Sequence, residues 1–168
     1  RLIRRHTMGM MRRTDRQQDE TFARYLFTAC EYALLCTVNP AGDPYCVPIS
    51  PVLVGDRFYF HSATVGTKLD NIANHAKVSL ACVGKTKLLP ERFSTDYESA
   101  IAYGEAQLVE DPLEKRQALM LISDKYAASN IAAAPAYIES SLHEVAVVRV
   151  MISEFTAKAR ISKEKTTE

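Results

Sequence analysis

Residues 58–71 read Phe-Tyr-Phe-His-Ser-Ala-Thr-Val-Gly-Thr-Lys-Leu-Asp-Asn, and this stretch decides the fold. An aromatic strand ends near His61, and a turn of small and hydroxyl residues follows it. The change to helical spacing then predicts a short helix from about Thr67. The free N–H groups at the start of a helix attract anions, and Lys68 adds a full positive charge there.

The residues of this turn allow two interpretations. A phosphate would fit it, because Ser62 and Thr64 offer hydroxyl donors beside Lys68. The same pattern also describes an ordinary strand-to-helix turn with a solvated lysine, since Gly, Ser and Thr are common in turns. Neither GxGxxG nor GxxxxGK followed by Ser or Thr is present, so the two best-known nucleotide loops are absent.

Outward from this turn, short apolar runs alternate with turn-forming residues. Strands are expected at residues 32–38, 45–54, 57–61, 77–83, 97–109 and 144–152 or 144–157, the first two as a hairpin. Helices are expected at residues 19–30, from about 67, at 111–126 and at 135–141, and a polar loop at 88–96. About six short antiparallel strands with interspersed helices favour a mainly β barrel over a doubly wound sheet.

Three residues interrupt the strand pattern. Pro48 and Pro51 cannot donate a ladder hydrogen bond, so their strand is expected to lie at a sheet edge or to contain a bulge. An edge would also leave backbone groups free for a ligand. Gly104 predicts a bulge or bend in the strand at 97–109.

The composition is that of one globular domain of 168 residues, 47% hydrophobic and 24% charged. A net charge of +1 argues against nucleic-acid binding by a broad, positively charged surface. No apolar run approaches the roughly 20 residues of a membrane span, so none is predicted. We expect a leader or disordered arm at residues 1–10, a single domain at 11–161 and a charged, frayed tail at 162–168.

Four cysteines occur, Cys30, Cys36, Cys46 and Cys82. They show no CxxC spacing and the histidines do not cluster, so neither a metal site nor a redox dithiol is expected. Three of the four lie in apolar strand-like or helical stretches and are interpreted as small buried hydrophobes. Reduced thiols suit a cytoplasmic protein.

Three segments in order carry a resemblance: residues 44–50 (Pro-Tyr-Cys-Val-Pro-Ile-Ser), residues 58–71, and residues 94–104 (Ser-Thr-Asp-Tyr-Glu-Ser-Ala-Ile-Ala-Tyr-Gly). Together they resemble the NimA-type, 5-nitroimidazole-resistance-related branch of the pyridoxamine 5′-phosphate oxidase-like flavin proteins. Met11-Arg-Arg near the start and Lys158-Ala-Arg160 near the end match that branch too, so the resemblance covers nearly the whole domain.

The resemblance implies a six-stranded, antiparallel split β-barrel of Greek-key type, a homodimer, and FMN at the dimer interface. By position, Lys68 and Ser62 would bind the flavin phosphate. The other implied contacts are His61, Ala63 and Thr67 beside the phosphate, Val47, Pro48 and Ile49 along the isoalloxazine edge, and Tyr97 and Ser99 near the cofactor across the interface. Tyr97 and Ser99 alternate along their strand and so share one face of it.

The role of His61 stays open between two interpretations. It is a candidate catalytic residue that contacts flavin or substrate and donates a proton near neutral pH, or it is a structural histidine bonded to a backbone group. Family members that oxidise pyridoxamine phosphate carry basic residues where this chain has the apolar Val47-Pro-Ile49, so vitamin B6 oxidation is not expected.

Three functional hypotheses follow. The first is an FMN-dependent oxidoreductase that reduces a small nitroaromatic or related acceptor, with NAD(P)H as donor. The second is a non-enzymatic flavin- or haem-binding sensor or storage module on the same barrel, because fold does not determine function. The third is a structural barrel dimer whose turn binds nothing.

Overall fold

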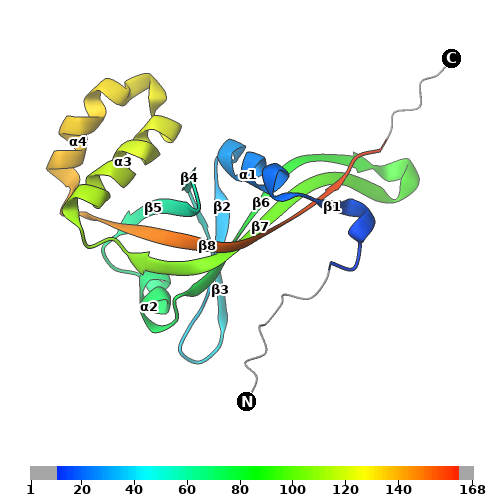
Figure 1. Cartoon of the computed structure of the whole chain (residues 1–168), viewed down its shortest axis with the longest axis horizontal. Helices are drawn as coiled ribbons and strands as arrows, with labels where there is room; N and C mark the ends of the chain where they lie inside the picture. Colours follow the sequence, from blue (N-terminus) through cyan, green and yellow to red (C-terminus); the bar gives the residue numbers. More distant parts are fainter. Residues whose placement is uncertain (1–10, 163–168) are drawn as a thin grey trace.

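The computed structural model describes residues 11–162, which form a curved antiparallel sheet flanked by helices (Figure 1). The strands are β1 (Gln17–Gln18), β2 (Ala33–Val38), β3 (Pro44–Ile49), β4 (Val52–Val54), β5 (Arg57–Ala63), β6 (Lys77–Leu89), β7 (Ser94–Leu108) and β8 (Val145–Arg160). The helices are α1 (Glu20–Ala29), α2 (Thr67–Asn74), α3 (Pro112–Tyr126) and α4 (Ala134–Ser141), with 3₁₀ turns at Thr14–Arg16, Pro90–Arg92 and Ala128–Ala133. The leader expected at 1–10 and the tail from 163 lie outside the described residues.

The sheet is curled because the chain joins its two edges directly. The strand order is β3-β2-β6-β7-β8-β5-β4, with β1 paired to β8, so β3 and β4 are the two edge strands of the main path. Only Ser50 and Pro51 separate them in the chain, and such a connection spans about 10 Å at most. The edges therefore meet at this corner, and β6-β7-β8-β5 has Greek-key order, as a split barrel requires.

Two apolar clusters hold the layers together. The inner cluster fills the curl of the sheet around Phe27 of α1, with Phe58 and Phe60 of β5 fully buried beside it. The Phe27 and Phe58 rings meet edge to face with centroids 4.9 Å apart, a favoured aromatic geometry. The outer cluster packs Leu119 and Ile122 of α3, with residues of α4, against the other face of β4, β5 and β8.

The predicted helix starts and the sheet edge are confirmed. Asp19 accepts a hydrogen bond from the Phe22 amide at 2.8 Å, and Asp111 accepts two from the first turn of α3. Pro48 lies in the edge strand β3, where its missing N–H costs no ladder bond. A register shift between Tyr103 and Gly104 confirms the predicted bulge.

The predicted count of six strands is wrong for the described residues, which contain eight strands. Pro51 divides the expected strand at 45–54 into β3 and β4, and residues 17–18 form the short β1. Ser162 was expected to belong to a frayed tail. Instead its amide and hydroxyl donate to Asp96 at 2.8 and 2.9 Å.

The polar loop predicted at residues 88–96 is also wrong. Strands β6 and β7 continue through it and turn at Pro90–Arg92, so they form a long hairpin that projects from the barrel (Figure 1). Leu88 and Phe93 near its tip are 75% and 99% exposed. Leu89 is buried, but residues 90–93 are all exposed, so the tip lacks the apolar alternation by which a strand is recognised in a sequence.

A polar cluster ties α3 to the sheet. Glu114 accepts hydrogen bonds from the Tyr59 hydroxyl at 2.7 Å and from Arg149 Nη1 at 2.7 and 2.9 Å. The Tyr59 hydroxyl and then Arg149 are the main reasons that the pKa of Glu114 lies below its usual value. This carboxylate therefore stabilises the folded chain only while it is ionised.

We expect Glu114→Gln to destabilise the chain by about 1–2 kcal/mol at pH 7, the size of a lost charge-assisted contact. A carboxyl whose pKa is lowered on folding stabilises above its unfolded pKa, and this contribution is lost as pH falls through the folded value. Urea denaturation of the wild type should thus show stability falling below about pH 4.5, the ordinary value for Glu. In Glu114→Gln this loss should be smaller, and an equal loss in both proteins would contradict the assignment.

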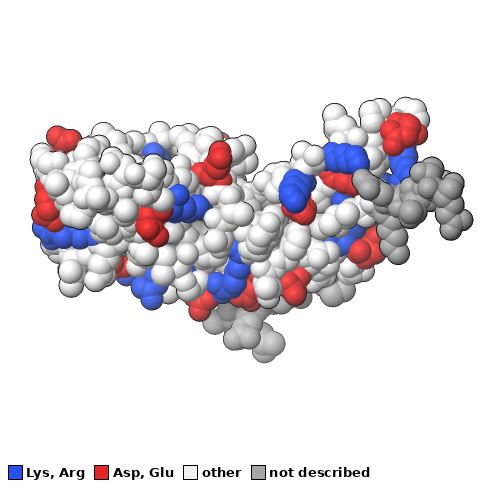
Figure 2. Space-filling model, turned by 90° about the horizontal axis from the view of Figure 1, so that it is seen from above, with Lys and Arg blue, Asp and Glu red and all other residues white. Residues whose placement is uncertain are grey.

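Charges are mixed over the face shown in Figure 2, where Lys and Arg lie among Asp and Glu without a large patch of either sign. Among the described helices, none is both long and apolar enough to span a membrane.

Candidate functional site

The turn between β5 and α2 forms as predicted. Gly66, at φ +140°, is the residue before the first turn of α2, and its carbonyl accepts from the amides of Leu69 and Asp70. Residues with side chains rarely adopt this φ, so glycine suits the position. The amides that precede Leu69 in the helix lack an intrahelical acceptor, which makes this turn a place where an anion can bind.

Lys68 and His61 are brought together at this turn. Lys68 is half-buried in the first turn of α2, and among the described residues no carboxylate pairs with it. The pKa of His61 is lowered, first because surrounding atoms shield the ring from water and then because of the positive charge of Lys68. The ring is therefore neutral near pH 7, and an anion bound at this turn would pair with the charge of Lys68.

The remaining residues of the turn differ in their exposure and in the face of the sheet to which they point. Ser62 is buried, and its hydroxyl donates to the Ala63 carbonyl at 2.7 Å, so it must rotate to donate to a ligand. His61 and Ser62 are neighbours in a strand and point to opposite faces of the sheet. Ala63 and Thr67 are exposed. The turn therefore offers a ligand one cation, free amides and a reorientable hydroxyl.

Strand β3 lies near this turn. The side-chain amide Nδ2 of Asn71 in α2 donates to Thr37 Oγ1 of β2 at 2.9 Å, and β2 pairs directly with β3. Val47 and Ile49 pack on the same inner cluster as Leu69 of α2. Pro48 points the other way and is exposed. The structure thus brings the predicted phosphate turn and the predicted flavin-edge strand to one part of the barrel.

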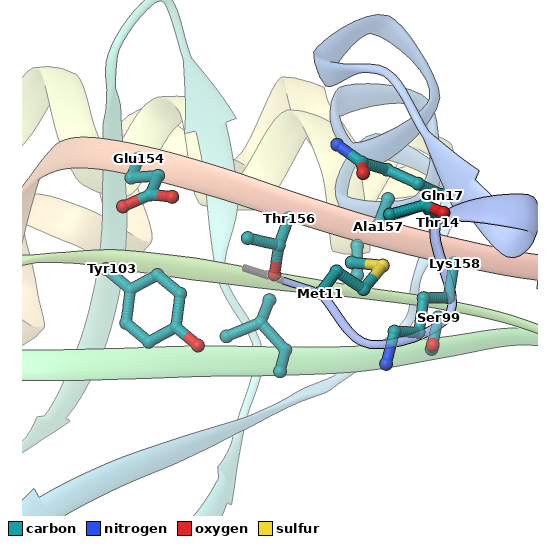
Figure 3. Close-up of a pocket in the computed structure, with 11 residues that line it drawn as sticks. Met11, Thr14, Gln17, Ser99, Tyr103, Glu154, Thr156, Ala157 and Lys158 are labelled. Atoms are coloured by element: carbon teal, nitrogen blue, oxygen red, sulfur yellow. The ribbon is translucent and has the colours of Figure 1, made fainter. Parts of the chain in front are cut away.

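Ser99 lies in a different place, at a groove of about 580 Å³ on the outer face of β7 and β8 (Figure 3). The N-terminal segment forms one wall of this groove through Met11, Thr14 and Gln17. Among the described residues, none from β3, β5 or α2 lines it. Within one chain, Ser99 is therefore not in the same hollow as the predicted phosphate turn.

Sequence reasoning missed most of this groove. Its floor alternates along two paired strands, with Ser99 opposite Lys158, Ile101 opposite Thr156 and Tyr103 opposite Glu154. The polar alternation from 154 to 158 is visible in the sequence and could have pointed to an outward face. Lys158 is half-buried, and in the described part of the chain no carboxylate pairs with it.

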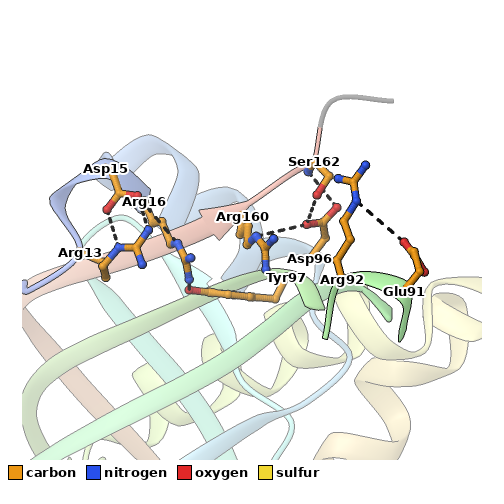
Figure 4. Close-up of polar contacts among 9 residues, drawn as sticks. All are labelled: Arg13, Asp15, Arg16, Glu91, Arg92, Asp96, Tyr97, Arg160 and Ser162. Carbon is orange, nitrogen blue, oxygen red and sulfur yellow. Dashed lines mark hydrogen bonds and ion pairs between the residues drawn. The ribbon is translucent and has the colours of Figure 1, made fainter. Parts of the chain in front are cut away.

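Tyr97 lies farther along β7, in the polar contacts at the base of the long hairpin (Figure 4). Arg16 Nη1 donates to its hydroxyl at 3.5 Å, a long contact. Asp96 beside it accepts from Ser162 and lies 3.8 Å from Arg160 Nε, and the hydrogen bonds from Ser162 help to lower its pKa. These contacts tie the N-terminal segment and the end of β8 to β7.

Comparison with known proteins identifies the family to which this fold belongs. A family model described as pyridoxamine 5′-phosphate oxidase matches residues 32–159. Among curated proteins, no sequence matches the chain significantly. A solved structure of a candidate 5-nitroimidazole antibiotic resistance protein from Bacteroides thetaiotaomicron is 25% identical, with a TM-score of 0.71 and coverage of 84% of both chains.

Two further solved structures share the fold. The FAD and haem binding protein from Mycobacterium smegmatis is 19% identical, has a TM-score of 0.77, and is matched over 88% of this chain and 74% of that one. The flavocytochrome Anf3 from Azotobacter vinelandii is 19% identical, has a TM-score of 0.69, and is matched over 94% of this chain and 77% of that one. The predicted resemblance and the split-barrel fold are confirmed. Because the family model extends from β2 almost to the end of β8, the chain belongs to the pyridoxamine 5′-phosphate oxidase family.

Proposed function

We propose that this protein binds FMN and works as an oxidoreductase on a small nitroaromatic or related acceptor. The observation that carries the proposal is the half-buried Lys68, which lies at the start of α2 beside His61 and has no carboxylate partner among the described residues. A phosphate there would supply the missing negative charge and accept from the free amides of the helix start. The residues present fit the phosphate end of a flavin nucleotide.

The ring end of the flavin is assigned to β3 and a second copy of the chain. Val47 is half-buried and Pro48 exposed, so this strand offers apolar contact and, as an edge, free backbone groups. The outer sheet face carries exposed apolar side chains, among them Val83 at 64% and Leu34 at 37%. Such a surface is suited to an interface. In a homodimer, the groove at Ser99 and, farther along β7, Tyr97 of one copy would complete the site of the other.

The protein's own residues then have simple tasks. Flavin supplies the electron transfer, with NAD(P)H proposed as the donor, while the protein binds, orients and shields the reacting groups. Lys68 holds the phosphate and β3 supports the ring edge. His61, neutral near pH 7, can donate one hydrogen bond to the bound nucleotide or acceptor.

A visible spectrum of freshly purified protein tests the binding. We expect flavin absorption, and release of FMN identified by mass. A colourless protein that fails to bind added FMN would overturn the proposal, and a Soret band would favour haem, the group named for the structural neighbour from Mycobacterium smegmatis.

Turnover is tested separately. Under anaerobic conditions we expect NAD(P)H to bleach the bound flavin and a nitroimidazole to restore its colour. A flavin that binds but is not reduced or reoxidised in this assay would favour a sensor or storage module instead.

A further inference from the structure

Two thiols on the outer face of the sheet lie within reach of each other. Cys36 of β2 stands directly opposite Cys46 of β3 in the antiparallel register, and their Sγ atoms are 3.6 Å apart. Both are free thiols, Cys46 being exposed and Cys36 half-buried. They are ten residues apart in the sequence, so only the hairpin brings them together. The interpretation of most of the cysteines as buried hydrophobes is wrong, since among the four only Cys82 is buried.

The backbone places this pair at the type of position where a disulfide can form. The Asn39 amide donates to the Asp43 carbonyl at 3.0 Å, so the pair nearest the turn is a hydrogen-bonded pair. Pair types alternate along an antiparallel ladder, so Pro44 and Pro48, which lack an N–H, fall at non-hydrogen-bonded positions.

Cys46 lies midway between these prolines and therefore has the same pair type. Residues in such a pair have Cα atoms about 4.5 Å apart. This spacing lies within the range that a disulfide accepts, about 4.4–6.8 Å, at its short end. Bonds at the edge of that range are strained and more easily reduced.

We propose that Cys36 and Cys46 form a reversible dithiol–disulfide pair that is oxidised by exchange with a low-molecular-weight disulfide such as glutathione disulfide. The Cys46 thiolate attacks one sulfur of that disulfide, the S–S bond breaks, and one glutathione leaves and takes up a proton. The Cys36 thiolate then attacks Cys46 Sγ and expels the second glutathione. The protein loses two S–H hydrogens, and two glutathione thiols form.

The order of attack follows from exposure. Cys46 is accessible to a bulky disulfide, whereas burial and the neighbouring thiol raise the pKa of Cys36 and keep it protonated. Once the mixed disulfide exists, Cys36 lies beside it and the second step is intramolecular. The product would link the edge strand β3 to β2 covalently, on the face opposite to Val47 and Ile49.

The test is incubation of the full chain with glutathione disulfide, alkylation of remaining thiols, and peptide mapping by mass. We expect a Cys36–Cys46 cross-linked peptide, alkylated Cys30 and Cys82, and full recovery of four thiols with dithiothreitol. Amide hydrogen exchange across residues 44–49 should slow in the oxidised form. Four alkylated thiols at excess glutathione disulfide would overturn the proposal, and so would a link that joins other cysteines or two chains.

Single variants separate the two steps. Cys36→Ser should stop at a stable glutathione adduct on Cys46, and Cys46→Ser should give little adduct and no cross-link. Cys30→Ser is the control and should still form the Cys36–Cys46 link. A Cys36→Ser protein that gains no adduct, while the wild type cross-links, would contradict the assignment of Cys46 as the attacking thiol.

Discussion

Gly104→Ala is expected to prevent stable folding or to lower the free energy of unfolding by about 3 kcal/mol or more. A Cβ at this position would lie 2.3 Å from the Met151 carbonyl oxygen, and 3.0 Å from the Met151 carbonyl carbon and a Val150 methyl. The closest of these atoms is backbone of the paired strand β8, which cannot move aside as a side-chain end can. The clash falls at the bulge in the longest ladder of the sheet, between β7 and β8.

Gly55→Ala is the matched control for this prediction. Gly55 has φ +55°, and a Cβ there meets nothing within 4 Å, so the change should cost only the strain of a left-handed alanine, about 1–2 kcal/mol. Urea denaturation of both variants, followed by circular dichroism, measures the difference. Midpoints lowered equally in the two proteins would show that close approach of β8 is not what requires glycine at 104.

Local signals explain why much of the fold could be predicted. The caps at Asp19 and Asp111 depend on residues within one helical turn of each other, and the structure shows both bonds. The proline positions placed β3 at an edge because the constraint is carried by a single residue type. The change from strand to helix near Thr67 is likewise a change of apolar period within a few residues.

The features that could not be predicted depend on contacts between residues far apart in the sequence, or lie where a strand has few packing partners. In the hairpin at residues 88–96, Leu89 is buried while residues 90–93 are exposed, so the sequence has no apolar alternation to recognise. The groove at Ser99 needs Met11 and Lys158, which lie near opposite ends of the chain, and the pairing of β1 with β8 brings the N-terminal segment to this groove. The thiol pair needs the exact hairpin register, because a shift by one residue would send Cys46 to the other face.

The candidate site, too, could be predicted only in part from the sequence. The sequence left the turn at 62–68 open between a phosphate site and an ordinary turn, and the resemblance alone favoured the first. The structure adds a physical reason, since Lys68 is half-buried beside His61 without a carboxylate partner among the described residues. It also shows that Ser99 lies in another hollow, which the sequence could not reveal.

Lys68→Ala is expected to weaken FMN binding about 10- to 100-fold, the loss of one charge-assisted contact of about 1.5–3 kcal/mol. Fluorescence titration of the apoprotein with FMN measures it. Lys77→Ala is the first control, because this exposed lysine at the start of β6 should leave the affinity unchanged. Lys68→Arg keeps the charge and should recover part of the affinity.

Lys158→Ala is the discriminating variant, because Lys158, like Lys68, is half-buried without a carboxylate partner in the described chain, and it lies in the outer groove. If the turn at α2 holds the phosphate, this change should weaken FMN much less than Lys68→Ala does. Titration with riboflavin, which lacks the phosphate, sharpens the comparison, since Lys68→Ala should then have little effect. Loss of FMN affinity in Lys158→Ala alone would move the phosphate to the groove beside Ser99, and the turn at 62–68 would be an ordinary connection between strand and helix.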